Sequence, residues 1–548
     1  MEARSNRVAK KNDGFIMQAG ILAMAGIICR IIGILYRSPL AAVIGDEGNG
    51  YYSSAYNIYT IILLISSYSI PSAISKVIAG KLALREYKNA QRIFYCAFIY
   101  VIVVGGIASL FAFFAAGILV EKNAVIVLRV FAPTIFFSGL LGVLRGYFQA
   151  HRTMVQTSLS QILEQILNAV ISITAAYMLK QAVIDQDLTT QAVYGAMGSA
   201  LGTGAGVLIA LAFMWLIYGL NKKIIAKRLE NDPSPNVLTY GEIFKIIFAL
   251  VTPFILSTFI YNFSNSLDET IYRKILKLVK GVDVSQIATW YGVYAGKAVV
   301  ISNIPIAISS AISAAMIPSI SGKFATGDMD GTREKVHTAM LATMLISIPA
   351  AVGMGVLAKP MVSFLFAGQT SLDLAADLLR ALSVTVIFYA LSTLTNAVLQ
   401  GIGRVNIPVI NAFIALVIQT LVLVGCLWFT EWNLYCLAIA VIVYSLMMCI
   451  LNGISVRKSL DFKQDVKKLF ILPFVASLFM GAVAFGVYEG LYALVKSNVI
   501  SLIIAVVIGA AVYGLLVIKL GVLSREEILS MPKGQKLLGL LTKLKLIK

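Results

Sequence analysis

Long runs of hydrophobic residues dominate this chain, and short polar or charged stretches separate them. Each run is about 20 residues or longer, which is enough for a helix to cross roughly 30 Å of hydrocarbon. Transmembrane strands would instead alternate apolar and polar residues over about ten positions, a pattern that this sequence lacks. The pattern therefore predicts an all-α, polytopic membrane protein with about fourteen transmembrane helices. We place them near residues 15–36, 51–77, 93–120, 124–147, 155–178, 192–220, 243–272, 287–321, 336–366, 374–402, 407–430, 434–456, 468–495 and 498–519.

The same hydrophobic pattern occurs twice along the chain. One copy begins at Gly50 with GYYSSAYNIYTIILLISSYSIPSAISKVIA, and the other begins at Gly292 with GVYAGKAVVISNIPIAISSAISAAMIPSISGK. A second matching pair follows in the same order, LRG at 144–146 and LQG at 399–401. Similar strings at a nearly constant offset are typical of an internal duplication. We therefore expect a first lobe over residues 1–230, a second lobe over 231–457 that repeats it, and two further helices with a basic tail over 458–548.

The composition excludes a soluble globular protein. Hydrophobic residues make up 59% of the chain, charged residues only 13%, and the mean hydropathy is +0.87. The formal net charge of +19 would suggest a nucleic-acid partner in a soluble protein. Here most Lys and Arg residues fall in alternate loops between the apolar runs, which is the distribution that the positive-inside rule gives to cytoplasmic loops. We therefore expect a multi-pass protein of the plasma membrane with both termini in the cytoplasm and no nucleic-acid partner.

The sequence contains no motif for catalysis, nucleotide binding or metal binding. Its two histidines, His151 and His337, fall in predicted cytoplasmic loops. Its five cysteines lie in apolar runs without CxxC spacing, so we interpret them as small packing residues. The sequence therefore predicts no catalytic residue, no metal site and no cofactor, which indicates a protein that is not an enzyme.

Several charged side chains fall inside the predicted spans, where each costs at least about 2.5 to 3.5 kcal/mol at mid-depth. Arg30 lies in the first span and Lys297 in the eighth. If the two repeats line one cleft, both cations face a cavity that favours an anionic ligand, and Arg30 is particularly suited to phosphate. Arg37 and Arg273 lie near the outer ends of the first and seventh spans and extend this positive character. Two alternatives remain open: Arg30 only pairs with an acidic side chain to hold helices together, and Arg37 and Arg273 face solvent or lipid headgroups.

The fifth span carries a polar stripe that cannot face lipid, because its polar residues recur at three- and four-residue spacings. Glu164 is its acidic member and would either carry a coupling proton or cation or balance Arg30. Asp268 and Glu269, in the seventh span near the outer water, are further candidates for ion coupling. The amides of Gln161 and Asn262 are candidate contacts for a polar substrate. The stripe consists of Gln156, Ser160, Gln161, Glu164, Gln165 and Asn168.

Three segments of the chain resemble one superfamily of membrane transporters. The segment from Tyr36 to Ala79 resembles the polysaccharide-export and mouse-virulence-factor branches of the multidrug/oligosaccharidyl-lipid/polysaccharide (MOP) exporter superfamily, and most of all its Gram-positive lipid II flippase and stage V sporulation protein B group. The segment that begins at Arg145, RGYFQAHRTMVQTSLSQILEQ, is similar to that group's R-G-x-x-Q-G-x-x-x-M-x-x-x-A-x-S-Q-x-x-E-Q. The segment that begins at Tyr291, YGVYAGKAVVISNIPIAISSAISAAMIPSIS, is similar to its Y-G-x-Y-N-R-G…L-P…P-x-I-[ST].

The resemblance implies two six-helix lobes arranged as a V, with two extra C-terminal helices that form a lipid-facing groove. It also places Arg30 on the arginine of the family's S-R-x-x-G motif, Arg37 one position from the next arginine, and Lys297 on or beside the arginine of the eighth span. Four departures from the family pattern occur here. Cys29 replaces the serine, and Ala-Gly-Lys at 295–297 replaces Asn-Arg-Gly. His151 replaces the glycine after the glutamine, and Gly50-Tyr51 occupies the place of an acidic residue found in the Gram-negative lipid II flippases. These departures bear on the substrate more than on the fold.

Two like halves in a bilayer are typical of transporters that bind their substrate between the repeats. Together with the resemblance, this makes the leading hypothesis a flippase that moves an undecaprenyl-pyrophosphate-linked saccharide, first of all the peptidoglycan precursor lipid II, by alternating access. An H⁺ or Na⁺ gradient or the membrane potential would supply the energy, and membrane lipids and cell-wall synthesis proteins would be partners. One alternative is a cation-coupled multidrug antiporter of the same superfamily, which would need acidic residues in its cleft. Another is a non-transporting scaffold for envelope assembly. The sequence leaves open whether the cargo is lipid II, a teichoic-acid or capsule unit, or a spore-cortex precursor.

Overall fold

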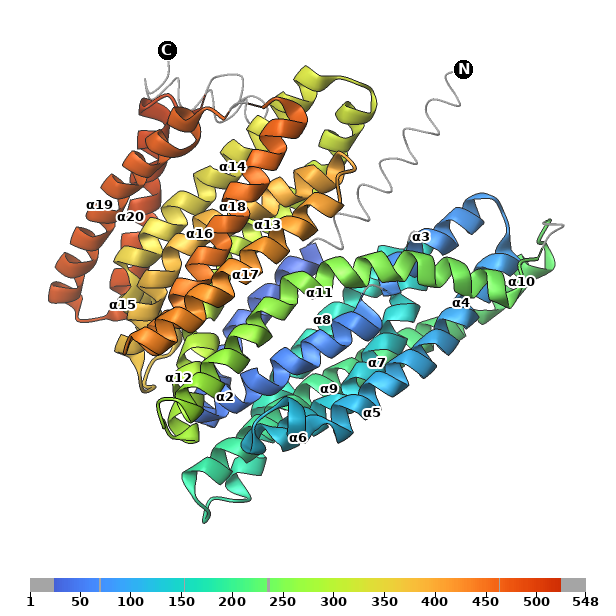
Figure 1. Cartoon of the computed structure of the whole chain (residues 1–548), viewed down its shortest axis with the longest axis horizontal. Coiled ribbons are helices and arrows are strands. Elements are labelled where there is room, and N and C mark those ends of the chain that lie inside the picture. The colour runs from blue at the N-terminus through green and yellow to red at the C-terminus, as the bar shows by residue number, and fades with distance from the viewer. Residues whose placement is uncertain (1–23, 69, 152, 234–236, 463, 524–548) are drawn as a thin grey trace. The chain divides into compact units, whose positions relative to one another are not determined.

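The computed structural model describes residues 24–68, 70–151, 153–233, 237–462 and 464–523 (Figure 1). These residues form helices and no strand, which confirms the predicted all-α class. Among them, 11 helices are long and apolar enough to cross a membrane, or up to 12 if the bent pair Met24–Leu35 and Arg37–Ser67 is one span. The chain is therefore a multi-pass membrane protein, and the total of about fourteen spans stays a prediction.

Packing divides the described chain into two compact units. The first contains the described residues up to Thr270 together with Asp283–Gly292, and the second contains Ile271–Val282 and the described residues from Val293 onward. The boundary falls inside the long helix α11 (Tyr240–Leu278), whereas the sequence suggested a boundary after residue 230, where α10 (Lys222–Glu230) ends. Most of α11 thus packs with the first unit, and its last turns pack with the second.

The first unit is built around α7, which packs against α2, α3, α5 and α9, while α8 lies along α9. α2 is kinked at Gly45, whose φ of 72° lies in the left-handed region that favours glycine. π-helical turns separate α2 from α3 and α4 from α5. The elements are Met24–Leu35, α2 (Arg37–Leu63), η1 (Leu64–Tyr68), α3 (Ile70–Ala83), α4 (Tyr87–Tyr100), η2 (Val101–Gly105), α5 (Gly106–Phe114), α6 (Ala116–Leu119), η3 (Lys122–Ala124), α7 (Val125–Ala150), α8 (Met154–Gln181), α9 (Leu188–Leu220), α10, α11 and α12 (Val284–Val293).

The second unit repeats this pattern of neighbours. α16 packs against α13, α14 and α18, and α17 lies along α18, just as α7 and α8 pack in the first unit. The shared arrangement supports the duplication that the sequence indicates. α19 and α20 lie side by side, with α19 against α14 (Figure 1). The elements are η4 (Tyr294–Ala298), α13 (Val299–Ala325), α14 (Met329–Val356), α15 (Ala358–Leu365), α16 (Leu372–Gly401), α17 (Asn406–Phe429), α18 (Leu434–Leu460), η5 (Lys467–Ile471), α19 (Leu472–Val495) and α20 (Asn498–Lys519).

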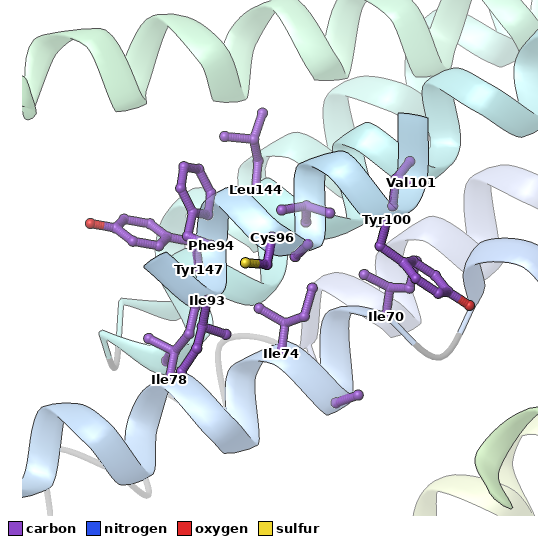
Figure 2. Close-up of a cluster of buried hydrophobic side chains, with 14 of the residues drawn as sticks. Ile70, Ile74, Ile78, Ile93, Phe94, Cys96, Tyr100, Val101, Leu144 and Tyr147 are labelled. Atoms are coloured by element: carbon purple, nitrogen blue, oxygen red, sulfur yellow. The ribbon is translucent and has the colours of Figure 1, made fainter. Parts of the chain in front are cut away.

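An apolar core joins α3, α4 and α7 in the first unit (Figure 2). Ile70, Ile74 and Ile78 recur every four residues along α3, so their side chains leave the helix on one face and meet α4 and α7. Because lipid is as apolar as these side chains, close van der Waals packing is what stabilises such a contact in a membrane. Leu141 and Val207 belong to this core and also line the cavity described below, so the core supports one wall of that cavity.

Glycines on α9 allow α8 to approach very closely. A Cβ atom at Gly202 would lie 2.2 Å from the Oγ of Ser172, and one at Gly206 would lie 2.7 Å from the carbonyl oxygen of Glu164. Any larger residue would force the two backbones apart. These glycines form a small-residue packing face of the kind that lets membrane helices approach closely. It also fixes the rotation of α8: Asn168, a member of the polar stripe, lies against α9, where its Oδ1 accepts a hydrogen bond from the Oγ1 of Thr203 at 3.3 Å.

The two glycines that open the repeats meet at one helix crossing within the first unit. A Cβ atom at Gly50 of α2 would lie 2.0 Å from the carbonyl oxygen of Ala288 in α12, and one at Gly292 would lie 1.8 Å from the carbonyl oxygen of Asp46. Both positions therefore require glycine for the same reason, the close approach of α2 and α12. This explains why Gly begins both of the matching strings.

Candidate functional site

A cavity of about 640 Å³ lies within the first unit. Its walls come from residues 33–37 and from α2, η1, α3, α7, α8 and α9. The volume falls in the range of about 300 to 1,000 Å³ that is usual for small-molecule sites. Most of the lining side chains are aromatic or polar, unlike a lipid-facing surface; they are Tyr36, Arg37, Tyr52, Tyr56, Tyr59, Thr60, Ser67, Ser138, Arg145, Gln149, Gln161, Glu164, Gln165, Asn168 and Thr203.

The polar stripe of α8 faces this cavity, as the sequence predicts. Gln161, Glu164, Gln165 and Asn168 all line it. The Oδ1 atom of Asn168 accepts a hydrogen bond of 2.9 Å from the Oγ of Ser172, which holds that amide in place. Within the described part of the chain, the side chains of Gln161 and Gln165 form no hydrogen bond to protein, so their amides can bind water or a ligand.

Glu164 forms an ion pair with Arg145 of α7, a partner that the sequence analysis did not suggest. The Nη2 atom of Arg145 lies 2.7 Å from the Oε2 of Glu164, and its Nε donates to the Oγ of Ser160 at 2.9 Å. The side chains are 14% and 29% exposed, so the pair lies on the cavity wall and is not sealed in the core. A ligand that enters the cavity can therefore reach both charges.

Arg37 is the second cation of the cavity. Its guanidinium lies over the ring of Tyr52 at 5.4 Å and over that of Tyr36 at 5.9 Å, distances at which a cation is attracted to an aromatic ring. Arg37, which the sequence places near the outer end of its span, lies in the wall of this cavity. Apart from tyrosines, the ionisable side chains of the described lining are Arg37, Arg145 and Glu164, so positive charge is in excess.

Lys297, a predicted substrate cation, lies in the second unit and is completely buried. It belongs to the π-helical turn η4, a kind of irregularity that is frequent at functional sites. Its Nζ atom donates a hydrogen bond of 2.7 Å to the carbonyl oxygen of Thr370 and lies 6.0 Å from the ring centre of Phe366. Arg273, a second predicted substrate cation, is only 5% exposed. Both cations are thus enclosed by protein in this structure.

The acidic pair of α11 is buried as well. Asp268 and Glu269 are 3% and 4% exposed, so protein covers both side chains. Glu269 accepts a hydrogen bond from the Nδ2 of Asn57, which also donates to the hydroxyl of Tyr291 at 2.8 Å. This cluster ties α2 to α11 and α12 within the first unit.

Two more predicted substrate contacts, Arg30 and Asn262, are not among the described lining residues of this cavity. Arg30 belongs to the helix Met24–Leu35; its side chain is exposed and does not line the cavity. The backbone of Asn262 is part of α11, but its side chain lies outside the described residues. The cavity therefore joins three of the predicted site residues, Arg37, Gln161 and Glu164.

The sequence analysis missed the cation that pairs with Glu164, although one signal for it was present. The matching strings LRG at 144–146 and LQG at 399–401 differ in the residue that carries charge. Arg145 is a departure from the repeat, and within a membrane a charge that only one copy carries points to a function of that copy.

Comparison with known proteins agrees with this architecture. The chain matches the family described as polysaccharide biosynthesis protein over residues 16–324, which is more than half of its length. It belongs to this family. Residues 295–424 also match the MatE family. The resemblance seen in the sequence is thereby confirmed, and the chain is a member of the MOP superfamily.

Two proteins of Bacillus subtilis (strain 168) are similar to most of this chain. The chain is 25% identical over 418 residues to the lipid II flippase MurJ of Bacillus subtilis (strain 168), which covers 73% of this chain and 75% of that protein. It is 22% identical over 535 residues to stage V sporulation protein B of the same organism, with 94% and 98% covered.

Two solved structures share the fold. One is the lipid II flippase MurJ in an inward closed conformation, with a TM-score of 0.65, 15% identity, and 90% of this chain and 97% of that chain covered. The other is a multidrug resistance MATE family transporter of the MOP superfamily in an inward-facing conformation, with a TM-score of 0.61, 17% identity, and 82% and 98% covered. The family and these neighbours indicate a membrane transporter or flippase and not an enzyme.

Proposed function

We propose that this protein is a flippase for an undecaprenyl-pyrophosphate-linked saccharide, and that its cargo is the peptidoglycan precursor lipid II. The observation that carries the proposal is the polar cavity in the first unit, whose lining contains two arginines and one glutamate. Positive charge in a low-dielectric enclosure attracts an anion, and guanidinium groups match phosphate oxygens in geometry. The similarity to a protein named lipid II flippase supports the choice of cargo.

In this proposal Arg37 and Arg145 bind the pyrophosphate. Both line the cavity, and Arg145 is already engaged with a carboxylate at 2.7 Å, a geometry that a phosphate oxygen can reproduce. Arg30, Arg273 and Lys297 remain predicted contributors from outside this cavity. The prenyl chain would stay in lipid beside α19 and α20, which follow the duplicated helices at the end of the chain.

Energy coupling is assigned to the Arg145–Glu164 pair in the same proposal. A pyrophosphate that binds Arg145 competes with Glu164 for the same guanidinium. Substrate entry would then release Glu164 from its ion pair, which makes Glu164 the first candidate for the coupling group. Asp268 and Glu269 are the second candidates for coupling H⁺ or Na⁺, and the membrane potential is the remaining energy source.

The proposal includes the plasma membrane as location and the cytoplasm as the side of both termini. The supporting observation is the concentration of Lys and Arg in alternate loops. Cysteine substitutions at Ser371, between α15 and α16, and at Gly327, between α13 and α14, would test it with an impermeant thiol reagent, because these two loops should lie on opposite sides of the membrane.

Depletion of the protein in its host tests the function directly. The expected result is accumulation of one lipid-linked precursor on the cytoplasmic face of the membrane, detected by chemical analysis of extracted lipids. Accumulation of a teichoic-acid or capsule precursor instead of lipid II would correct the cargo. If no precursor accumulates and the cells become hypersensitive to cationic drugs, the protein is a multidrug exporter. The MATE-like fold is the reason to test this alternative.

A further inference from the structure

One aromatic side chain of the cavity is far more accessible than its neighbours. Tyr56 lies in the interior of α2 and lines the cavity, and 37% of its surface is exposed. Tyr52 and Tyr59, one helical turn to either side, are only 2% and 4% exposed. Tyr56 therefore presents ring surface to the cavity, while the adjacent tyrosines mainly form the wall behind it.

The ring of Tyr56 is held from behind by other aromatic rings. It stacks on Tyr52 at 5.7 Å between centroids with an interplanar angle of 12°, and it contacts Tyr59 at 5.7 Å. Phe131 of α7, which is fully buried, meets Tyr56 edge-on at 5.9 Å. A ring fixed in this way offers a rigid flat surface at little cost in conformational entropy.

Free amide groups share the cavity with this ring. Gln149 of α7 and Gln161 and Gln165 of α8 line it, and within the described residues none of their side chains hydrogen-bonds to protein. Each amide can both donate and accept a hydrogen bond. Leaving such groups unpaired against an apolar ligand would cost free energy, so they favour a ligand that carries hydroxyl or amide groups.

A saccharide matches both features. The C–H groups of one face of a sugar ring carry partial positive charge and suit the negative face of an aromatic ring, while its hydroxyl groups suit amides. A cationic ligand suits the site less well, because Arg37 already lies over Tyr52 and the lining carries excess positive charge.

Building on the proposed function, we propose that Tyr56 is the platform on which the saccharide of the lipid-linked substrate stacks, and that Gln161 and Gln165 bind its hydroxyl groups. This divides the cavity into two parts. Arg37 and Arg145 hold the pyrophosphate whatever sugar is attached, and Tyr56 with the two amides distinguishes substrates that carry sugar from those that do not.

The test compares two ligands on the full chain in lipid nanodiscs. The probes are undecaprenyl pyrophosphate without sugar and undecaprenyl pyrophosphate that carries a disaccharide, and the measurement is the Kd of each. For the unmodified protein we expect the sugar-bearing lipid to bind more tightly. Tyr56→Leu keeps an apolar side chain of moderate size but removes the ring, so it should weaken binding of the sugar-bearing lipid by about three- to tenfold and leave the sugar-free Kd unchanged. Tyr56→Phe should retain most of the preference.

Tyr177→Leu is the matched control, because Tyr177 lies on α8, is 55% exposed and does not line the cavity. It should change neither Kd, and thermal unfolding of each variant shows whether it is folded. If Tyr56→Leu leaves the ratio of the two Kd values as it is in the unmodified protein, or weakens both ligands equally, the saccharide platform is wrong. If the unmodified protein binds both lipids equally, the platform is wrong and the flippase proposal stands. If it binds neither, the proposed function itself has failed.

Discussion

Helices α7 and α8 of the first unit match α16 and α17 of the second unit in the predicted repeat but differ in charged residues. The offset that relates Arg145 to Gln400 also relates Glu164 to Gln419. In the first unit the two positions form an ion pair at 2.7 Å on the wall of a cavity. In the second, Gln400 interacts with Asn396 on its own helix, and Gln419 is fully buried. The two units thus share the packing of these helices but differ in the charge of the side chains at these two positions.

The cations of the two units differ in the same way. Arg37 and Arg145 line a cavity, whereas the ammonium of Lys297 is buried and donates to the carbonyl oxygen of Thr370. All three fall in apolar segments, so the sequence raises the same question for each. A charge within the bilayer shows that some partner is needed, and only the three-dimensional structure shows whether that partner is protein or can be a ligand.

Removing Arg145 should have the largest effect. Arg145→Gln introduces the residue that the second unit has at this position and leaves Glu164 without its cation. We expect transport of a pyrophosphate-linked lipid to fall about tenfold or more, because a charge-assisted contact to phosphate is lost. The measurement is the rate of lipid translocation in reconstituted vesicles. The free energy of unfolding should also fall, by about 1 to 3 kcal/mol, since a partly buried carboxylate becomes uncompensated.

The double variant Arg145→Gln/Glu164→Gln separates transport from stability. It reproduces the neutral pair of the second unit, so the stability lost in the single variant should return while transport stays low. Recovery of transport together with stability would mean that the pair only holds α7 and α8 together. The comparison between the two units would then carry no functional meaning at these positions.

A smaller effect is expected for Lys297, and it lies in stability first. Lys297→Met should lower the free energy of unfolding by about 1 to 3 kcal/mol, because the carbonyl oxygen of Thr370 loses its donor in a buried site. Lys297→Gln keeps a donor and should lose less. Binding of undecaprenyl pyrophosphate to the folded Lys297→Met protein should weaken less than in Arg145→Gln, because Lys297 lies outside the cavity. If stability is unchanged and binding is lost, Lys297 belongs with the phosphate-binding cations, as the sequence analysis expected.

The parts of the fold that the sequence predicted follow from periodicity and composition. Apolar length gives membrane helices, and the spacing of Gln161, Glu164, Gln165 and Asn168 gives a stripe that must avoid lipid. Both depend on neighbours along one helix. The sequence shows Gly50 and Gly292 as matching positions of the repeat. The structure adds the steric reason for glycine, which is the close crossing of α2 and α12 at both positions.

The contacts between helices could not be predicted in the same way. Arg145 and Glu164 lie on consecutive helices, but their pairing depends on the rotation of α8, which the glycines of α9 set. Tyr56 could not be separated from Tyr52 and Tyr59 because all three recur on one face of α2 and all three contact Phe131, and only the structure shows that Tyr56 alone of the three is exposed. A sequence pattern identifies a face, whereas the residue that a ligand can reach is decided by what packs against that face.

The smallest expected effect concerns His151, whose matching position in the second unit is not a histidine. The offset between the repeats places Asn406 at its position in the second unit. His151 follows α7 just outside the span, its Nδ1 lies 2.9 Å from the carbonyl oxygen of Tyr147, and its ring packs 4.4 Å from the Tyr147 ring. Burial lowers the pKa of His151 below its ordinary value; the positive charge of Arg228 acts in the same direction, and the hydrogen bond to Tyr147 partly opposes both.

The sign of the resulting pH dependence follows from this shift. Near and below pH ~6.5 the unfolded chain binds a proton at His151 more readily than the folded protein does, so stability falls as the pH decreases through that range and is unaffected above it. His151→Asn should therefore lose less stability than the unmodified protein between about pH 7.5 and pH 5.5, measured as the shift in thermal midpoint. His337→Asn, at the other histidine of the chain, controls for the replacement of a histidine by asparagine as such. If the unmodified protein and His151→Asn show equal shifts in thermal midpoint, the histidine of the first unit and the asparagine of the second respond to acid in the same way at this position.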